Sequence, residues 1–222
     1  AAFVGNVSYT DAFVTKQEHE TTKKANARRW SGLPECTLYS KENKEVLTIG
    51  QSNTILRYIG SVSTPVMYPA NALLAALCDE VLDSCEDTKA AILGGLATEQ
   101  DRQKLVSKEG ALTYWLGKFE LRLQENAKRN GGDDNAGYVV GNELTIADLK
   151  LFELFHGLWL IFESYEDVKV EELVAAYPAI QKHYALVKSN DAVQEFLQKF
   201  SLRNSEFKAD PDDEDIKTQT YK

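Results

Sequence analysis

The most informative stretch of this sequence is Gly50-Gln51-Ser52-Asn53-Thr54-Ile55-Leu56-Arg57-Tyr58-Ile59. Gly50 ends the strand-like pattern of residues 45–49, and Ser52 occupies the position expected for the N-cap of a helix. A hydroxyl and free backbone N–H groups at a helix N-terminus favour an anion, and Gln51 adds a side-chain donor and acceptor. The stretch therefore predicts a strand, a turn and a helix that offer a seat for a small carboxylate. Ser is also a common N-cap for structural reasons alone.

The residues before this stretch alternate between strand-like and helix-like patterns. Residues 9–14 have the alternation of a short strand, and residues 16–30 are rich in helix formers up to a Ser-Gly break. Residues 33–39 and 45–49 are strand patterns on either side of a polar turn. The order strand, helix, hairpin, helix predicts a small α/β domain over residues 1–62.

After Gly60 the pattern of the sequence changes. Residues 63–71 carry two prolines and little periodicity, which is typical of a linker. Apolar residues recur at three- and four-residue spacing in residues 72–202, as in an all-helical domain. Residues 203–222 are polar, and five of the six positions 210–215 are acidic, so we expect an extended or flexible tail. The helices are expected at residues 72–92, 99–130, 145–163, 170–176 and 178–189.

Charge and composition argue against several kinds of function. With 25 basic and 34 acidic residues the net charge is −9, so we expect no nucleic-acid partner and no attraction to an acidic membrane. The apolar run at residues 154–162 is too short to cross a bilayer, and no signal-peptide pattern opens the chain. Three cysteines, Cys36, Cys78 and Cys85, suit a reducing compartment, so a cytoplasmic location is expected. Since Met67 is the only methionine, we expect the chain to be less than a whole translation product.

Familiar catalytic and metal-binding motifs do not occur in the sequence. There is no nucleophile elbow, phosphate loop or dinucleotide loop. His19, His156 and His183 have no second ligand at metal-binding spacing, so no metal site is expected. Basic residues gather over positions 23–29, and such a cluster is more often a solvated helix face than an anion site.

The stretch at residues 50–59, together with Leu33-Pro34 and the hairpin between them, resembles the glutathione-binding half of cytosolic glutathione transferases. The resemblance implies a cis Leu33–Pro34 bond, with the backbone of Leu33 pairing with the cysteinyl amide of glutathione. It also implies that Gln51 and Ser52 hold the γ-glutamyl carboxylate and amine. Without the resemblance, Pro34 would be an ordinary strand-initiating proline.

The helical half resembles the same family independently. Val139-Val140-Gly141-Asn142-Glu143-Leu144-Thr145-Ile146-Ala147-Asp148 is similar to its buried capping motif, in which Thr145 and Asp148 satisfy each other's backbone donors. Residues 75–87 resemble the first helix of the helical domain in the classes that use a tyrosine. In those classes the position of Asp87 faces the glutathione of the neighbouring subunit of a homodimer. The alternative for Asp87 is a solvated acid on a helix surface.

The sequence departs from the family pattern in two places. The family's Trp and Lys that contact the glycine carboxylate have no clean match, although Lys23 or Lys24 would serve. In the family, a first strand carrying the thiol-activating residue precedes the segment that matches residues 7–11. We therefore expect that residue to lie before Ala1 and assign no catalytic residue. Tyr9 carries a hydroxyl nearby, but it aligns with the second strand of the family, so it is not assigned as the activating residue.

The resemblance covers roughly residues 3–200 and implies a thioredoxin-like α/β domain followed by an all-helical domain. The implied reaction is attack of the glutathione thiolate on a small electrophile, with glutathione as co-substrate and no metal. Contacts to the electrophile are expected around Tyr114, Trp115 and Lys118. The alternative is a binding or structural subunit with the same fold and no turnover.

Overall fold

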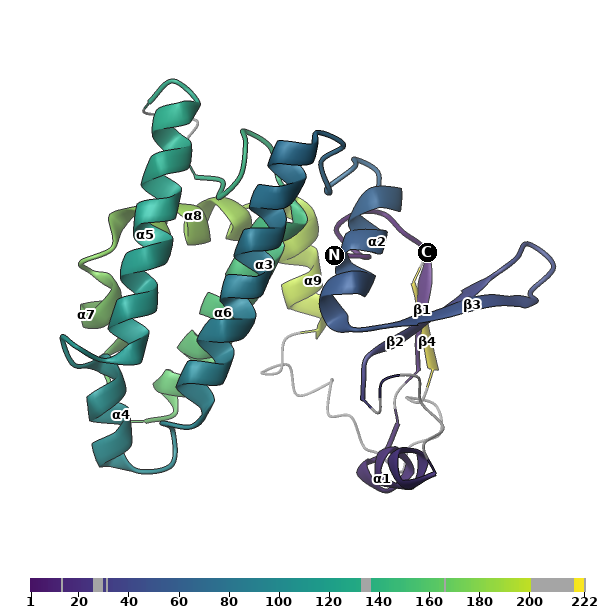
Figure 1. Cartoon of the computed structure of the whole chain (residues 1–222), viewed down its shortest axis with the longest axis horizontal. Coiled ribbons are helices and arrows are strands. Elements are labelled where there is room, and N and C mark those ends of the chain that lie inside the picture. Colours follow the sequence, from purple (N-terminus) through teal and green to yellow (C-terminus); the bar gives the residue numbers. More distant parts are fainter. Residues whose placement is uncertain are drawn as a thin grey trace. The chain divides into compact units, whose positions relative to one another are not determined.

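The structure is a computed structural model that describes residues 1–12, 14–25, 30, 32–132, 137–165, 167–200 and 218–221. The chain forms two compact units, Ala1–Met67 with Gln194–Lys222, and Tyr68–Val193. The first unit is α/β and the second is helical (Figure 1), which confirms the thioredoxin-like plus all-helical fold class. The division between the units falls inside the expected linker. Gln194–Lys222 groups with the first unit, whereas the sequence placed residues up to 202 with the helical domain.

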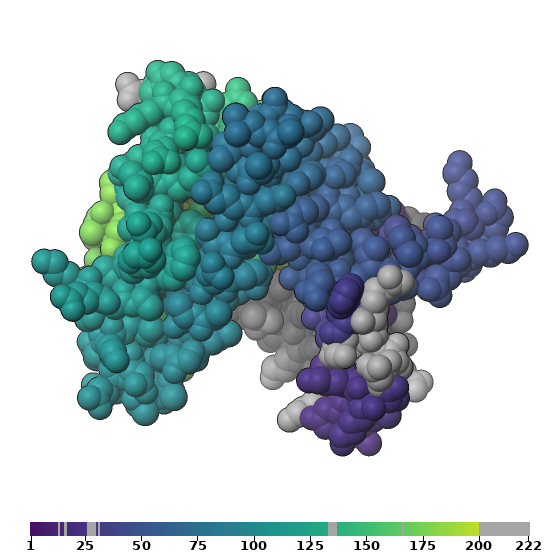
Figure 2. Space-filling view, viewed as in Figure 1, coloured from purple at the N-terminus to yellow at the C-terminus, as the bar shows by residue number. Residues whose placement is uncertain are grey.

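Up to Met67, the described residues of the first unit form a β-hairpin, one further strand and two helices. Its elements in chain order are β1 (Tyr9–Ala12), α1 (Lys16–Lys24), β2 (Glu35–Tyr39), β3 (Glu45–Gly50) and α2 (Ser52–Val62). β2 and β3 pair antiparallel from Glu35↔Gly50 to Tyr39↔Glu45, and their turn projects from the surface (Figure 2). α1 ends at Lys24, earlier than the sequence predicts, and residues 26–29 lie outside the described residues.

A strand that the sequence did not predict pairs with β1. β4 (Thr218–Tyr221) runs antiparallel to β1, with Tyr9 opposite Tyr221 and Ala12 opposite Thr218. This strand belongs to the stretch expected as an extended or flexible tail. The acidic positions 210–215 of that stretch lie outside the described residues.

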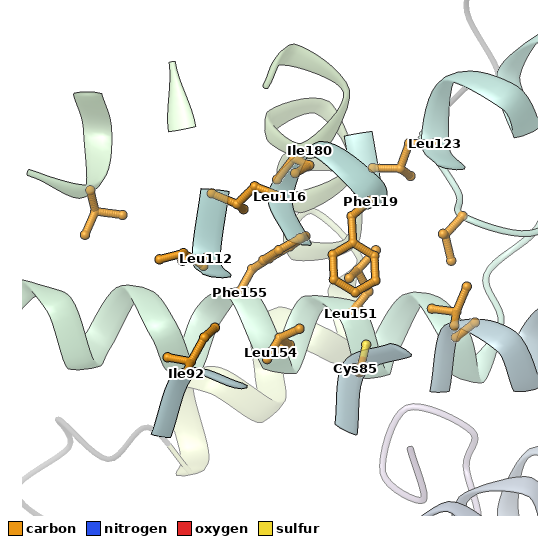
Figure 3. Close-up of a cluster of buried hydrophobic side chains, with 14 of the residues drawn as sticks. Cys85, Ile92, Leu112, Leu116, Phe119, Leu123, Leu151, Leu154, Phe155 and Ile180 are labelled. Carbon is orange, nitrogen blue, oxygen red and sulfur yellow. The ribbon is translucent and has the colours of Figure 1, made fainter. Parts of the chain in front are cut away.

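The second unit is built from helices around one apolar core. Its helices are α3 (Ala72–Leu93), α4 (Glu99–Val106), α5 (Ala111–Arg129), α6 (Ile146–Glu163), α7 (Val170–Val174) and α8 (Pro178–Lys188), and α9 (Asp191–Phe200) crosses into the first unit. Side chains from α3, α5, α6 and α8 meet in the core, among them Cys85, Phe119, Leu151 and Ile180 (Figure 3). Within the part of the chain that the structure describes, no helix has the length and apolarity needed to span a membrane.

Residues 99–130, expected as one helix, form two helices separated at Gly110. α4 ends at Val106 and α5 begins at Ala111 with Gly110 as its N-cap. A Cβ atom at Gly110 would collide with the backbone carbonyl oxygens of Lys104 and Leu105, so the chain makes a tight turn at this point. The apolar spacing continues through the break, which is why periodicity alone does not reveal it.

The start of α6 is fixed by a buried carboxylate. Thr145 is the N-cap and Asp148 is the third helical residue of a capping box. One carboxylate oxygen of Asp148 accepts from the backbone N–H of Thr145 at 2.8 Å and from its hydroxyl at 2.7 Å. The other accepts from the N–H of Val139 at 2.7 Å. Asp148 therefore ties the loop before α6 to the first turn of the helix.

Candidate functional site

The β2–β3 hairpin brings the two most informative motifs of the sequence together. Glu35, the first residue of β2, pairs with Gly50, the last residue of β3. Leu33 and Pro34 directly precede Glu35, and Gln51 directly follows Gly50, so both motifs lie at the same end of the hairpin. The Leu33–Pro34 peptide bond is cis, and Leu33 is 46% exposed.

The N-terminus of α2 differs from the sequence expectation by one residue. Gln51, not Ser52, is the N-cap, and Ser52 is the first helical residue. The cause is the backbone of Gln51, which turns at φ 72° and ψ 117°, a left-handed region that residues other than glycine rarely adopt. The N-cap makes no side-chain hydrogen bond. The hydroxyl of Ser52 is thus not used to cap the helix, and Gln51 and Ser52 are both exposed at the positive end of α2.

An aromatic side chain that sequence reasoning did not assign lies at the same place. A Cβ atom on Gly50 would come within 2.7 Å of Trp30 Cδ1, so the indole rests on the backbone just before Gln51. Trp30 is 61% exposed, so it flanks the site without being buried in a core. The signal available in the sequence was a tryptophan three residues before Leu33 and a glycine at the end of β3.

Lys24 lies on another element of the same unit. It is exposed in the last turn of α1, next to Lys23. Two cations at a helix C-terminus interact favourably with the helix dipole, so their presence has a structural reason of its own. The role of Lys24 toward a carboxylate stays a prediction.

The remaining predicted residues belong to the second unit. Asp87 is exposed on α3, while Thr145 and Asp148 are buried at the start of α6. Complete burial raises the pKa of the Asp148 carboxyl, and His183 together with the donated hydrogen bonds opposes that rise. Asp148 therefore has a structural position, and Asp87 is accessible.

Tyr114, Trp115 and Lys118, the residues expected to contact an electrophile, line one cavity between α3 and α5. Its volume is about 240 Å³, and Glu80 and Arg122 also line it. The ring of Tyr114 meets that of Trp115 edge to face at 5.5 Å. The Lys118 ammonium lies 5.1 Å from the centre of the Tyr114 ring. The cavity thus offers both aromatic surface and charge.

The cysteines and histidines do not form a reactive cluster in the described part of the chain. Burial raises the pKa of the Cys85 thiol to about 12 and that of Cys78 to about 11. Burial also raises the pKa of Cys36. Thiols with raised pKa values are poor nucleophiles. Among the described residues, no three His, Cys, Asp or Glu side chains gather as they would around a metal ion.

Comparison with known proteins gives the same fold. A sigma class glutathione S-transferase of Fasciola hepatica superposes with a TM-score of 0.68 at 18% identity, covering 89% of this chain and 87% of that one. A monomeric glutathione S-transferase of the hookworm Necator americanus gives a TM-score of 0.67 at 21% identity, covering 89% and 87%. These likenesses define the fold as that of a glutathione transferase.

Sequence comparison establishes the family. The family model for "Glutathione S-transferase, C-terminal domain" matches residues 86–200. Glutathione S-transferase P of Homo sapiens is 30% identical over 151 residues, and that of Pongo abelii is 31% identical. Both alignments cover 68% of this chain, and the chain spans 64% of the length of each relative. The chain belongs to the glutathione S-transferase family.

Proposed function

We propose that this chain binds glutathione at the end of the β2–β3 hairpin where Leu33–Pro34 meets Gln51–Ser52. The observation that carries the proposal is the Glu35↔Gly50 pairing, which places both motifs beside the N-terminus of α2. In this arrangement the backbone of Leu33 pairs with the cysteinyl amide, and Gln51 and Ser52 bind the γ-glutamyl group. Lys24 serves the glycine carboxylate.

The chemistry of the N-terminus of α2 supports a carboxylate ligand. The first N–H groups of a helix have no partner within the helix and carry partial positive charge. The side chains of Gln51 and Ser52 add further donors, and neither is used to cap α2. Hydrogen bonds to a carboxylate are stronger than those between neutral groups. A γ-glutamyl carboxylate is therefore favoured here over a neutral group of the same size.

The proposed activity is transfer of the glutathione thiolate to a small electrophile. A free thiol with a pKa near 8.5 is mostly protonated at neutral pH, so a donated hydrogen bond that lowers the pKa speeds attack. We assign no residue of this chain to that donor. The cavity that Tyr114, Trp115 and Lys118 line is proposed to contact the electrophile.

Glutathione binding is tested by calorimetry on the 222-residue chain and its Ser52→Ala variant. Loss of a hydrogen bond to a charged group is expected to weaken binding about ten- to a hundredfold. Ser61→Ala is the matched control, because Ser61 lies on the same helix and its hydroxyl donates to the Arg57 carbonyl. Equal affinities of the parent chain and Ser52→Ala would contradict the proposed site.

Conjugation is measured separately, with chlorodinitrobenzene as electrophile. Because no residue of this chain is assigned as the thiol-activating donor, we expect the 222-residue chain to turn over barely above the uncatalysed rate, and the same chain preceded by the first strand that the family resemblance implies to turn over well above it. Turnover of the extended chain that is lost on Ser52→Ala at low glutathione supports a transferase. Glutathione binding by the extended chain without turnover would instead support the alternative, a glutathione-binding subunit of the same fold. Since binding is measured independently, failure of the transferase proposal does not remove the binding site.

A further inference from the structure

A second cavity lies inside the helical unit, between α5, α6, α7 and α8. Its volume is about 240 Å³. Four of its wall residues are aromatic: Phe155, Trp159 and Phe162 from α6, and Tyr184 from α8. All the residues that line it belong to Tyr68–Val193, so the cavity does not depend on the glutathione site proposed in the first unit.

The cavity has a buried floor and an accessible mouth. Leu112, Leu116, Phe155 and Ile180 are buried and point toward one another in the core (Figure 3). Leu158, Leu173 and Val174, in contrast, are half-buried, and Gln181 is exposed. A molecule can thus enter between α6, α7 and α8 and reach an apolar floor without unfolding a helix.

Three polar groups of the wall already have a partner within the protein. The Tyr184 hydroxyl lies 2.8 Å from His156 Nδ1, and the Trp159 indole N–H donates to Glu163 at 2.7 Å. The amide nitrogen of Gln181 donates to the Val174 carbonyl at 2.9 Å. None of the described lining residues is Asp, Glu, Lys, Arg or His. Because a buried charge without a partner is strongly unfavourable, the cavity selects against ions.

Aromatic rings from α6 and α8 stack on one another at the cavity wall. The rings of Trp159 and Tyr184 stack with an interplanar angle of 16° and centres 6.0 Å apart. The ring of Phe152, which does not line the cavity, also stacks on that of Tyr184, with their centres 4.9 Å apart. Ring edges and faces in the wall pack favourably against another aromatic ring, so they favour an aromatic ligand over a branched aliphatic one.

We propose that this cavity is a binding site for uncharged, planar two-ring aromatic compounds. An apolar cavity of about 150 Å³ accommodates benzene, so the larger space here suits a ligand of about ten non-hydrogen atoms. Ligand sites are commonly concave, largely preformed and mostly apolar, with few polar groups. The Gln181 side chain at the mouth is the polar group that a ligand hydroxyl would meet.

The test uses 2-naphthol and calorimetry on the 222-residue chain. One molecule is expected to bind per chain. Leu158→Trp and Val174→Phe fill the mouth from two different helices and are each expected to weaken binding at least tenfold. Leu93→Trp is the control, because Leu93 is exposed at the end of α3 and does not line the cavity. Thermal unfolding verifies that each variant is folded. Because there are two filling variants, the test remains possible if one of them does not fold.

Two further measurements identify the site. Naphthalene-2-sulfonate, which has the same rings and a charge, is expected to bind at least tenfold more weakly than 2-naphthol. S-hexylglutathione, a glutathione with an alkyl group on its sulfur that would compete for the proposed glutathione site, is expected to leave 2-naphthol binding unchanged. The proposal is overturned if 2-naphthol does not bind, if both filling variants bind it as the control does, or if S-hexylglutathione displaces it.

Discussion

The buried carboxylate of Asp148 joins the loop before α6 to the first turn of that helix. Its side chain is fully buried and accepts hydrogen bonds from Val139 and from Thr145. His183, also fully buried, has its Nδ1 atom 2.6 Å from the carbonyl oxygen of Gly137 and 3.7 Å from Asp148. Because these donors have no access to water, each one left without an acceptor destabilises the fold.

We expect Asp148→Ala to lower the free energy of unfolding by about 3–5 kcal/mol, since it leaves buried N–H groups unsatisfied. The chain contains a matched control. Thr98 and Asp101 form the same Thr-x-x-Asp pattern at the start of α4, but there the hydrogen bonds are exposed. Asp101→Ala should cost about 1 kcal/mol or less. Urea unfolding measures both variants, and equal losses would show that Asp148 acts only as an ordinary cap.

Among the elements, the junction between α4 and α5 depends on one glycine. A side chain at Gly110 would meet the backbone carbonyl oxygens of α4's last turn, which cannot move aside as the tip of a side chain can. Gly117, on α5 itself, has nothing within 4 Å of a Cβ position. The same substitution at these two sites of one region is therefore expected to have opposite effects.

Gly110→Ala should destabilise the protein by at least about 2 kcal/mol, because the backbone must shift to relieve the overlap. Gly117→Ala should stabilise it by about 0.5–1 kcal/mol, because alanine loses less entropy in a helix interior. Thermal unfolding of the two variants provides the comparison. If Gly110→Ala unfolded at the temperature of the parent chain, the close approach of Gly110 to the last turn of α4 would be wrong.

The sequence predicted most elements because local patterns determine them. Strand alternation located β2 and β3, and apolar spacing located α3, α6 and α8 to within a residue or two. The break at Gly110 was missed because the apolar spacing continues across it, and that spacing does not show the tight turn that brings Gly110 against the last turn of α4. The N-cap of α2 was placed one residue too late, because the positive φ angle of Gln51 is unusual for a residue other than glycine. β4 was missed because it pairs with β1, about two hundred positions earlier in the chain, and a local pattern does not show so distant a pairing.

For the candidate site, the family resemblance named Leu33, Pro34, Gln51 and Ser52, and the hairpin register explains why they lie together. Trp30 was not assigned, since its position depends on how the chain folds back onto Gly50. The apolar cavity of the helical unit could not be predicted either. Its lining residues have the same spacing as ordinary core residues, and periodicity does not distinguish a filled core from one with a space in it.

For the whole molecule, we propose a homodimer in which Asp87 of one subunit approaches the glutathione of the other. Light scattering at micromolar concentration is then expected to give twice the 24.9 kDa mass of the chain. A mass of one chain would remove the role proposed for Asp87.

In a dimer, Asp87→Ala is expected to weaken glutathione binding about two- to fivefold, as for an exposed ion pair. Asp83→Ala, one turn earlier on α3 and also exposed, is the control. Calorimetry at low and at high salt distinguishes the two variants: the effect of Asp87→Ala should be smaller at high salt, because salt screens an exposed ion pair. A dimer whose affinity is the same in both variants would leave Asp87 as a surface acid.

The pairing of β1 with β4 has a mechanical consequence. Tyr9 and Tyr221 lie opposite each other at one end of the antiparallel ladder, and the hydrogen bonds of such a ladder run perpendicular to the strands. A force that pulls Tyr9 and Tyr221 apart, perpendicular to the strands, would act on one hydrogen-bonded pair at a time. The hydrogen bonds would then break one after another, and a weak force would separate the two strands. The same bonds loaded along the strands would have to break together.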